Sequence, residues 1–565
     1  MEEYNPLSSR EKTTIFLPLL LALALAGGTW LGFQLSNHQQ QDYTVVTEGG
    51  RKYHGKTGKV EEILRFIDAR YLETEDKNNL EEAAVKAVLD ELDPHSSYIS
   101  LEDIQGVNES LSGNFNGIGI EFYLLDDTIY VVGVIEGGPS DSAGLQCGDK
   151  IIAINDTTIA GQSIINNEVI GKLKGPAGST VNLSVKRAGK TGTETITIRR
   201  GQIPMRSVIA SYMVTSNTGL VKINRFSGTT HEEFKDALQI LVQNHQMEHL
   251  ILDLRHNPGG YLNAATEMLD QLFDSPKLLV YTEGRSYRRK EYNSTGRTSF
   301  DISKVVVLIN EGSASASEIM AGAVQDNDRG LIIGRRSFGK GLVQEQYKLS
   351  DGSALRLTVA RYFTPSGRYI QKPYEDTEIS YSDDLRQRYE SGELYSRDSI
   401  KMTDSTVYRT TNGRIVYGGG GIVPDIFIPL DTTRRNNYFQ SMGIVVREYV
   451  YKYLDNKRER LNKKYATYEA FQSNYQVDNA LLEQVVKYGV SKQIPKDATL
   501  VNQHRTALKL EIKACIADQL YGDMAYYQTI FTTDKMVNRA VEEIDRVGST
   551  TKAPSALKME AEQGI

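Results

Sequence analysis

Cysteine is almost missing from this sequence: Cys147 and Cys515 are the only two among 565 residues. Two thiols so far apart in the chain exclude a disulfide framework and a cysteine-based zinc site. Charged residues make up 24% and aromatic residues 8% of the chain, and these values exclude collagen-like and fully disordered proteins. At roughly 100–200 residues per domain, the length predicts about three to five domains.

The chain also lacks an excess of basic charge. Its 65 Lys and Arg residues face 72 Asp and Glu residues, which gives a formal net charge of −7. Such a chain has no global positive field that would recruit nucleic acid. Composition does not decide between a reducing and an oxidising compartment, because a scarcity of thiols suits both.

Charged residues are absent from the apolar run Ile15–Phe33, which is 19 residues long. That length is enough to cross a hydrocarbon core of roughly 30 Å. Arg10 and Lys12 precede the run, so the positive-inside rule keeps the N-terminus in the cytoplasm and exports the rest. We therefore expect a transmembrane anchor over residues 14–35. A signal peptide cleaved after Ala26 is the alternative, and it exports the same remainder.

Further along, helical spacing of apolar residues gives way first to strand-like alternation and then to alternating strand and helix patterns. The last pattern is typical of an α/β layer with a partly parallel sheet. The expected segments are a cytoplasmic tail over 1–13, the anchor over 14–35, a linker over 36–57, a helical segment over 58–105, a mixed module over 106–200, an α/β core over 201–430 and a helical region over 431–565.

A serine-rich turn, GSASASE at residues 312–318, opens an expected helix. A serine there lies among free backbone N–H groups at the positive end of the helix dipole, a setting that can hold an oxyanion. Ser315-x-x-Glu318 is also a capping box, which is the structural alternative. Spacing alone does not choose among Ser313, Ser315 and Ser317.

A glycine-rich turn contains Lys340. Residues 334–340 match most of a phosphate-binding loop, but Gly341 stands where that motif needs Ser or Thr, which disfavours a nucleotide-binding protein. A lysine between glycines can be desolvated, which lowers its pKa and lets it act as a general base. Gln344, four residues on, can orient the amine. A surface lysine in a turn is the alternative.

Other hydrolase signatures are missing. The sequence has no Gly-x-Ser-x-Gly elbow and no His-Glu-x-x-His, and its eight histidines are scattered. His95 follows a proline in a helix-end turn and is expected to be structural. His256 adjoins the segment NPGG at 257–260, where a backbone amide of the Gly-Gly pair can serve an oxyanion. A plain strand-to-helix turn explains the same residues.

Together these segments resemble the carboxyl-terminal processing, or tail-specific, proteases of the S41 serine peptidase family. The resemblance covers roughly residues 60–429, and several motifs occur in the family's order. The matching segments are LDPHS at 92–96, LDLRHNPGG at 252–260, SASASEI at 313–319 with QD at 325–326, FGKGLVQ at 338–344, and the turn DGS at 351–353.

The resemblance implies Ser315 as nucleophile, Lys340 as general base and Gln344 as the residue that positions the lysine. It implies an oxyanion hole formed by the amides of Gly260 and Ala316. It also implies an α/β protease core of the ClpP/crotonase-like type, with an inserted domain and without a metal or organic cofactor.

The mixed module resembles a PDZ domain. Successive backbone N–H groups of such a domain capture a peptide carboxylate, while the peptide adds as a strand beside a groove helix, here expected over residues 164–173. A structural β module without a ligand is the alternative. The carboxylate-binding loop would consist of Gly117, Ile118, Gly119 and Ile120.

The sequence thus predicts a single-pass protein of a bacterial inner membrane, with a periplasmic serine endopeptidase that cleaves proteins near or from their C-terminal tails. Expected partners are proteins or peptides with accessible tails and the membrane, with a homo-oligomer or an adaptor protein as further candidates and no nucleic acid. The rival hypothesis is a PDZ scaffold on an inactive protease-like core, which predicts tail binding without turnover.

Overall fold

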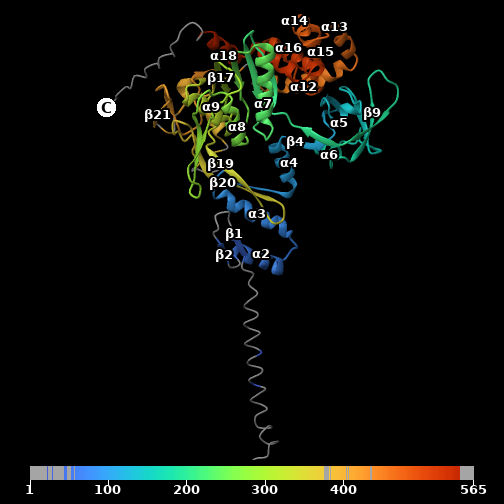
Figure 1. Cartoon of the computed structure of the whole chain (residues 1–565). Coiled ribbons are helices and arrows are strands. Elements are labelled where there is room, and N and C mark those ends of the chain that lie inside the picture. The colour runs from blue at the N-terminus through green and yellow to red at the C-terminus, as the bar shows by residue number, and fades with distance from the viewer. Residues whose placement is uncertain are drawn as a thin grey trace, which may run out of the picture. The chain divides into compact units, whose positions relative to one another are not determined.

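The computed structural model describes residues 58–374, 383–401, 406–432 and 436–546, with the stretches 43–46 and 52–55 and the single residues 22, 28, 381 and 404 (Figure 1). The expected anchor over 14–35 lies outside the described residues, apart from two single positions. Among the described residues, no helix has the length and apolar character needed to span a membrane.

The chain divides into two compact units, residues 1–92 and 93–565. In the first unit, β1 (Tyr43–Val46) pairs antiparallel with β2 (Lys52–Gly55). Two helices follow, α2 (Lys59–Arg70) and α3 (Lys77–Asp90). The Asp76 carboxylate caps α3 by accepting the N–H of Asn78 at 2.9 Å, a common way of satisfying a free helix donor.

A six-stranded sheet lies at the centre of the second unit. Its order is β12-β13-β14-β17-β18-β23, and all neighbours are parallel except β12 and β13. Parallel strands covered on both faces read as continuous apolar runs, and every residue of β13 and β14 is buried. The strands are β12 (Val208–Met213), β13 (Thr218–Ile223), β14 (His249–Asp253), β17 (Lys304–Ile309), β18 (Gly330–Gly334) and β23 (Ile426–Phe427).

Helices cover both faces of this sheet. Alternate strand residues such as Leu252 and Val307 pack with α7 (Thr230–Gln239), α8 (Leu262–Asp270) and α9 (Ala316–Asp326). The residues between them pack against α18 (Lys535–Arg546), near the C-terminus. This alternation is the two-residue period of a strand, and it makes α18 part of the core of the second unit.

A second sheet, of order β16-β15-β20-β19 with β3 added to β20, carries the segments that follow Lys340. The short helix α4 (Leu101–Ser112) leads from β3 toward the inserted module. The strands are β3 (Ser97–Ile99), β15 (Leu278–Glu283), β16 (Lys290–Asn293), β19 (Leu342–Lys348) and β20 (Ala354–Phe363).

The inserted module is entered and left through one strand pair, β4 (Asn114–Gly117) with β11 (Gly201–Pro204). Its sheet has the order β10-β9-β7-β6-β5, so β5 forms an edge, and β8 pairs with β7. The helix expected over 164–173 begins two residues later, as α6 (Asn166–Leu173). The other elements are β5 (Ile120–Leu125), β6 (Thr128–Val134), α5 (Pro139–Ser142), β7 (Lys150–Ile154), β8 (Thr157–Thr158), β9 (Thr180–Lys186) and β10 (Glu194–Arg199).

The C-terminal part is helical and has a hydrophobic core of its own, centred on residues such as Val446, Phe471 and Ile512. Its helices are α12 (Asn437–Leu454), α13 (Arg458–Lys464), α14 (Tyr468–Asn474), α15 (Asn479–Ser491), α16 (Ala498–Tyr521) and α17 (Asp523–Ile530). The remaining elements are η1 (Ile240–Asn244), α11 (Asp384–Glu390), η2 (Arg397–Ser399), β21 (Val407–Arg409), β22 (Ile415–Tyr417) and η4 (Phe531–Thr533).

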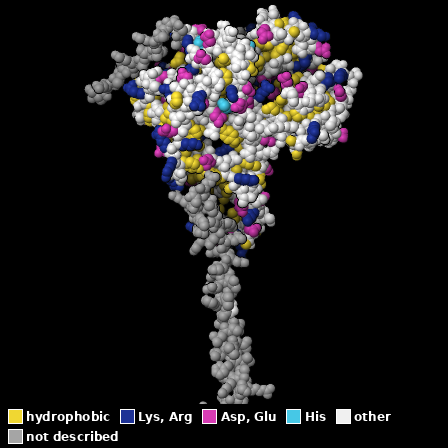
Figure 2. Space-filling model, viewed as in Figure 1, with side chains coloured by type: hydrophobic (Ala, Val, Ile, Leu, Met, Phe, Trp, Pro, Cys, Tyr) yellow, Lys and Arg dark blue, Asp and Glu magenta, His cyan; other side chains and the backbone are white. Residues whose placement is uncertain are grey.

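The surface agrees with the modest net charge. On the face seen in Figure 2, basic and acidic side chains are interspersed, and neither sign covers a broad area. This distribution agrees with the expected absence of a global positive field.

Candidate active site

Ser315 is the residue immediately before α9, and its backbone is strained. Its φ of 55° and ψ of −113° lie in a region that non-glycine residues rarely adopt. All eleven residues of α9 are buried, so the helix is held firmly in the core. The first N–H groups of a helix have no acceptor within it. Those of Ser317 and Glu318 donate to the carbonyls of Ala314 and Ser315, so the Ala316 amide beside Ser315 is the one left without a backbone acceptor among the described residues of this turn.

The three serines of the turn differ in whether their hydroxyl groups donate a hydrogen bond. Ser313 donates to the carbonyl of Leu254, and Ser317 donates to the carbonyl of Asn257, both at 2.9 Å. Both serines are fully buried. Ser315 is half-buried, and among the described residues nothing accepts its hydroxyl proton. Only Ser315 therefore combines an uncommitted proton with access from solvent.

The Glu318 carboxylate ties the serine turn to the lysine turn. One oxygen, Oε2, accepts the backbone N–H groups of Ser315 at 2.8 Å and Lys340 at 2.9 Å. The other, Oε1, accepts from the Ser337 hydroxyl at 2.6 Å and the Gly339 amide at 2.7 Å. Burial raises the pKa of Glu318 to about 6, although these four hydrogen bonds oppose the rise.

Half of the capping box expected from Ser315 and Glu318 is present. The Glu318 side chain accepts the Ser315 N–H, whereas the Glu318 N–H donates to the Ser315 carbonyl instead of its hydroxyl. The sequence did not reveal that the same carboxylate reaches the lysine turn 22 residues later. The sequence held one signal of this second contact. Glu318 lies among apolar residues at the start of the expected helix, and a buried carboxylate there needs several hydrogen-bond donors.

A second link between the two turns comes from β20. The Tyr362 hydroxyl lies within hydrogen-bonding distance of two backbone carbonyls, that of Ser315 at 3.2 Å and that of Lys340. Tyr362 is fully buried, so this polar contact is shielded from water. Sequence analysis assigned no role to Tyr362.

The Lys340 side chain has the properties of a potential base. Burial lowers the pKa of Lys340 to about 8, and the positive charge of Arg356 lowers it further, against the opposing charges of Glu318 and Asp93. Among the described residues, no carboxylate forms an ion pair with its ammonium group. A desolvated, unpaired lysine is neutral in a substantial fraction of molecules at mildly alkaline pH.

Gln344 lies on β19, and its contact differs from the expected one. Its side-chain N–H donates to the Thr358 hydroxyl at 3.3 Å, and that hydroxyl donates to Asp93 at 2.9 Å. The structure has no hydrogen bond from Gln344 to Lys340 among the described residues, so the expected positioning of the lysine stays a prediction.

The turn that carries Gly259 and Gly260 packs directly on the serine turn. A Cβ atom on Gly259 would lie 2.7 Å from Cβ of Ser315 and 3.0 Å from the amide nitrogen of Ala316. One on Gly260, whose φ is 145°, would lie 2.0 Å from the carbonyl oxygen of Phe226. Only glycine fits either position, and the close approach brings the turn beside the Ala316 amide.

The two histidines near these turns make other contacts. His95 Nε2 lies 2.6 Å from the Tyr381 hydroxyl, and burial together with the Lys340 charge lowers the pKa of His95 to about 4. His256 contacts the Asn310 amide, with its Nε2 at 2.9 Å from that nitrogen. His95 is therefore uncharged at neutral pH, in keeping with a structural part.

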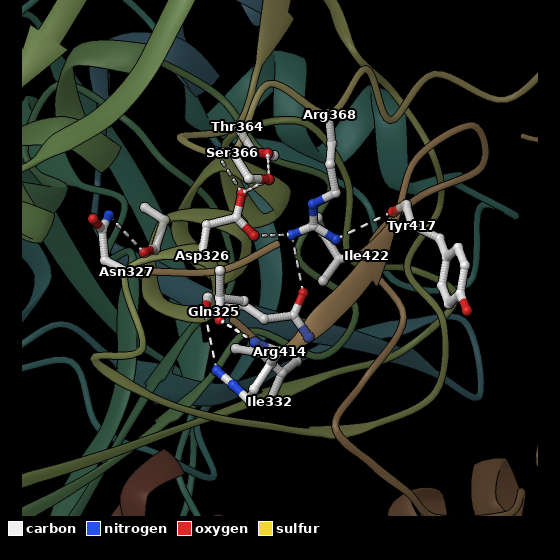
Figure 3. Close-up of polar contacts among 12 residues, drawn as sticks. Gln325, Asp326, Asn327, Ile332, Thr364, Ser366, Arg368, Arg414, Tyr417 and Ile422 are labelled. Carbon is white, nitrogen blue, oxygen red and sulfur yellow. Dashed lines mark hydrogen bonds and ion pairs between the residues drawn. The ribbon is translucent and has the colours of Figure 1, made fainter. Parts of the chain in front are cut away.

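A buried polar network fixes the far end of α9 (Figure 3). The Asp326 carboxylate pairs with Arg368 and accepts the Ser366 hydroxyl at 2.6 Å. Arg368 also donates to the Gln325 side chain at 3.0 Å, and Arg414 donates to the Gln325 carbonyl at 3.0 Å. The helix that presents Ser315 is thus held by hydrogen bonds at both ends.

The inserted module has the elements of a peptide groove. Its edge strand β5 follows directly on the tight turn at Gly119, whose φ is 77°. Val169 and Leu173 anchor α6 in the module's core. An edge strand leaves backbone N–H and C=O groups that an added strand can pair with.

Comparison with known proteins agrees with this geometry. Family models match as follows: peptidase family S41 at residues 217–379, a PDZ domain at 116–198 and a family of unknown function (DUF8443) at 441–522.

The carboxy-terminal-processing protease of Bartonella bacilliformis is 34% identical over 367 residues, which are 63% of this chain and 83% of that protein. The carboxy-terminal processing protease CtpB of Bacillus subtilis is 35% identical over 317 residues, which are 56% of this chain and 65% of that protein. Among solved structures, the photosystem II D1 C-terminal processing protease is 26% identical, with a TM-score of 0.32, and covers 66% of this chain and 87% of its own. This chain belongs to the carboxy-terminal processing proteases of the S41 family, which makes it a serine-type peptidase, and it carries a PDZ domain.

Proposed function

We propose that this protein is an exported, membrane-anchored endopeptidase that uses Ser315 as nucleophile and Lys340 as general base. The observation that carries the proposal is the shared Glu318 oxygen, which accepts the backbone N–H groups of both residues. The uncommitted Ser315 hydroxyl and the lowered pKa of Lys340 support the same pairing.

The reaction follows from these properties. The Ser315 hydroxyl attacks the carbonyl carbon of the scissile peptide bond, and the neutral Lys340 amine accepts its proton. The amides of Gly260 and Ala316 stabilise the oxyanion of the tetrahedral intermediate. The intermediate collapses to an acyl-enzyme as the lysine returns the proton to the leaving amine, and water then hydrolyses the ester. Gln344 orients the lysine within this cycle.

The PDZ domain recognises the C-terminal tail of the substrate. A peptide added along β5 pairs with its free edge, and α6 lines the other side of the groove. The carboxylate is bound by the backbone amides of the loop Gly117 to Ile120. The tail is thereby held while a nearby part of the same chain enters the protease site.

The anchor over 14–35 holds the catalytic part on the periplasmic side of a bacterial inner membrane. The support is the uncharged run Ile15–Phe33 behind Arg10 and Lys12. Mass spectrometry of the membrane-extracted protein tests it, because an intact N-terminus supports an anchor and a chain that begins after Ala26 supports a signal peptide.

Covalent labelling with a fluorophosphonate probe tests the dyad. We expect one adduct, on Ser315, and its loss in Ser315→Ala and Lys340→Ala, while Thr195→Ala, a control at an exposed position on β10 of the inserted module, keeps it. Full cleavage by both dyad variants would show that the assignment is wrong. Comparing a protein substrate bearing a free C-terminal carboxylate with its amidated form tests tail recognition, which requires a higher KM for the amide.

A further inference from the structure

The turn that carries Gly260 rests on a group of four charges at its base. Asp253 ends β14, and Arg255 begins the turn. The Arg255 guanidinium donates to both carboxylate oxygens of Asp253, at 2.9 Å from Nε and 2.7 Å from Nη2. Lys222 lies 3.3 Å from the same carboxylate and also donates to the Arg255 carbonyl.

The fourth charge, Asp534, comes from the C-terminal helical region. Its Oδ2 accepts from Arg255 Nη1 at 2.7 Å. Its Oδ1 accepts the backbone N–H groups of Met536 and Val537, so the same side chain caps α18. The ring of Phe531 lies 5.0 Å from the Arg255 guanidinium, on the same segment as Asp534.

The four groups balance each other in charge and are poorly exposed, with 0% of the Asp253 side chain and 11% of the Arg255 side chain accessible. Burial alone would raise the pKa of Asp253, but the charges of Arg255 and Lys222 hold it well below its usual range. Burial by itself would lower the pKa of Arg255, but the negative charges of Asp253 and Asp534 raise it above its usual value. Removing Asp534 leaves one positive charge uncompensated at the base of the turn.

The rest of the turn is fixed relative to Arg255. The amide of His256 donates to Asn310 at 2.9 Å, and the Asn257 side chain accepts the amide of Gly259 at 2.9 Å. Because Arg255, His256, Asn257 and Gly259 are each hydrogen-bonded to a neighbour, a shift of Arg255 is transmitted along the turn to Gly259, which packs on the serine turn, and to Gly260 beside it.

We propose that Asp534 is a positioning residue of the protease site, which acts through Arg255 to hold the turn 255–260 and the amide of Gly260. The helical region thereby takes part in catalysis without touching the substrate. This inference rests on the proposed oxyanion role of Gly260. Neither the S41 model nor the PDZ model covers Asp534.

The other end of the helical region supplies a matched control, since it contacts the PDZ domain instead. Asp455 pairs with Lys150 at 2.7 Å, and Gln519 donates to the Val132 carbonyl at 3.0 Å. Substitution at Asp455 changes the same helical region without reaching the turn. Val537, buried on α18 and three residues from Asp534, controls for loss of stability alone.

The test uses the full chain and two substrates, a short peptide ester without a tail and a protein with a tail. For Asp534→Ala we expect kcat on the ester to fall roughly 10- to 100-fold with KM unchanged, since a misplaced oxyanion donor costs transition-state binding. Asp534→Asn still accepts a hydrogen bond and caps α18, and we expect it to recover part of the loss. Val537→Ala lowers the melting temperature and keeps kcat within about twofold, and Asp455→Asn keeps the ester kcat unchanged.

Wild-type kcat in folded Asp534→Ala would overturn the proposal. So would a loss of kcat in Val537→Ala that matches the loss in Asp534→Ala, because the effect would then follow stability. Cleavage that persists in Ser315→Ala would instead overturn the proposed function, so the two failures are distinguishable.

Discussion

The backbone amides of Ser315 and Lys340 donate to the same oxygen atom, Oε2 of Glu318. The two nitrogen atoms, 2.8 and 2.9 Å from that oxygen, can be no more than 5.7 Å apart. They belong to residues 25 positions apart in the sequence, and nothing local holds them together. A buried carboxylate, with Tyr362 as a second link, thus limits the distance between the two backbones from which the side chains of the proposed dyad extend.

Activity should rise with pH. Lys340 accepts a proton only when neutral, and its pKa is lowered to about 8 by burial. We expect kcat/KM on a neutral ester substrate to be half-maximal near pH 8 and to fall about tenfold for each pH unit below about 7. A profile that is flat from pH 6 to 9 would contradict the assignment of Lys340 as the base.

Two substitutions should move this profile in opposite directions. The negative charge of Glu318 raises the pKa of Lys340, so Glu318→Gln should shift the half-maximal pH downward. The positive charge of Arg356 lowers that pKa, so Arg356→Gln should shift it upward. Each shift should be roughly 0.3–1 pH unit. The position of the midpoint is the measurement, because Glu318→Gln also lowers kcat through lost acceptors. Shifts in the same direction would show that these charges do not act on the base.

The strain at Ser315 should be measurable as stability. At φ 55° and ψ −113°, glycine is unstrained and alanine is strained. Both Ser315→Gly and Ser315→Ala remove the proposed nucleophile, so both should be inactive. We expect the glycine variant to have the higher free energy of unfolding, by about 1 kcal/mol, in urea titrations. Equal stability of the two variants would mean that the turn relaxes without the hydroxyl.

A methyl group on Gly259 should lower kcat strongly, whereas a methyl group on a glycine of the PDZ domain should leave kcat nearly unchanged. In Gly259→Ala the new atom would lie 2.7 Å from Ser315 Cβ, which must move. We expect kcat to fall by about 100-fold. Gly137→Ala is the matched control, because Gly137 also has a positive φ, of 71°, but a Cβ there meets nothing within 4 Å. Its kcat on the ester should stay within about twofold of wild type, and an equal loss in both variants would contradict the packing argument.

Much of the fold could be predicted from local patterns. The alternating strand and helix patterns predicted the α/β core over 201–430, and the GSASASE turn predicted the start of α9, because these features follow from short-range periodicity and capping. The same reasoning found the glycine turns at 259–260 and at Lys340. The long-range partners escaped it. Two examples are the hydrogen bond from Gln344 to Thr358 and the packing of α18 on one face of the central sheet. Neither could be predicted, because contacts between distant segments leave no local periodicity.

The sequence by itself determined the chemistry available to this protein: a serine before a helix, a lysine among glycines, a glycine pair after a strand, and a PDZ-like module. Only the tertiary structure decided which of three serines keeps a free proton, that Glu318 joins the serine and lysine turns, and that Asp534 pairs with Arg255 at the base of the turn that carries Gly260. The reason is physical. Burial and hydrogen-bond partners arise when distant segments pack together, and these two properties set the protonation state and position of each group.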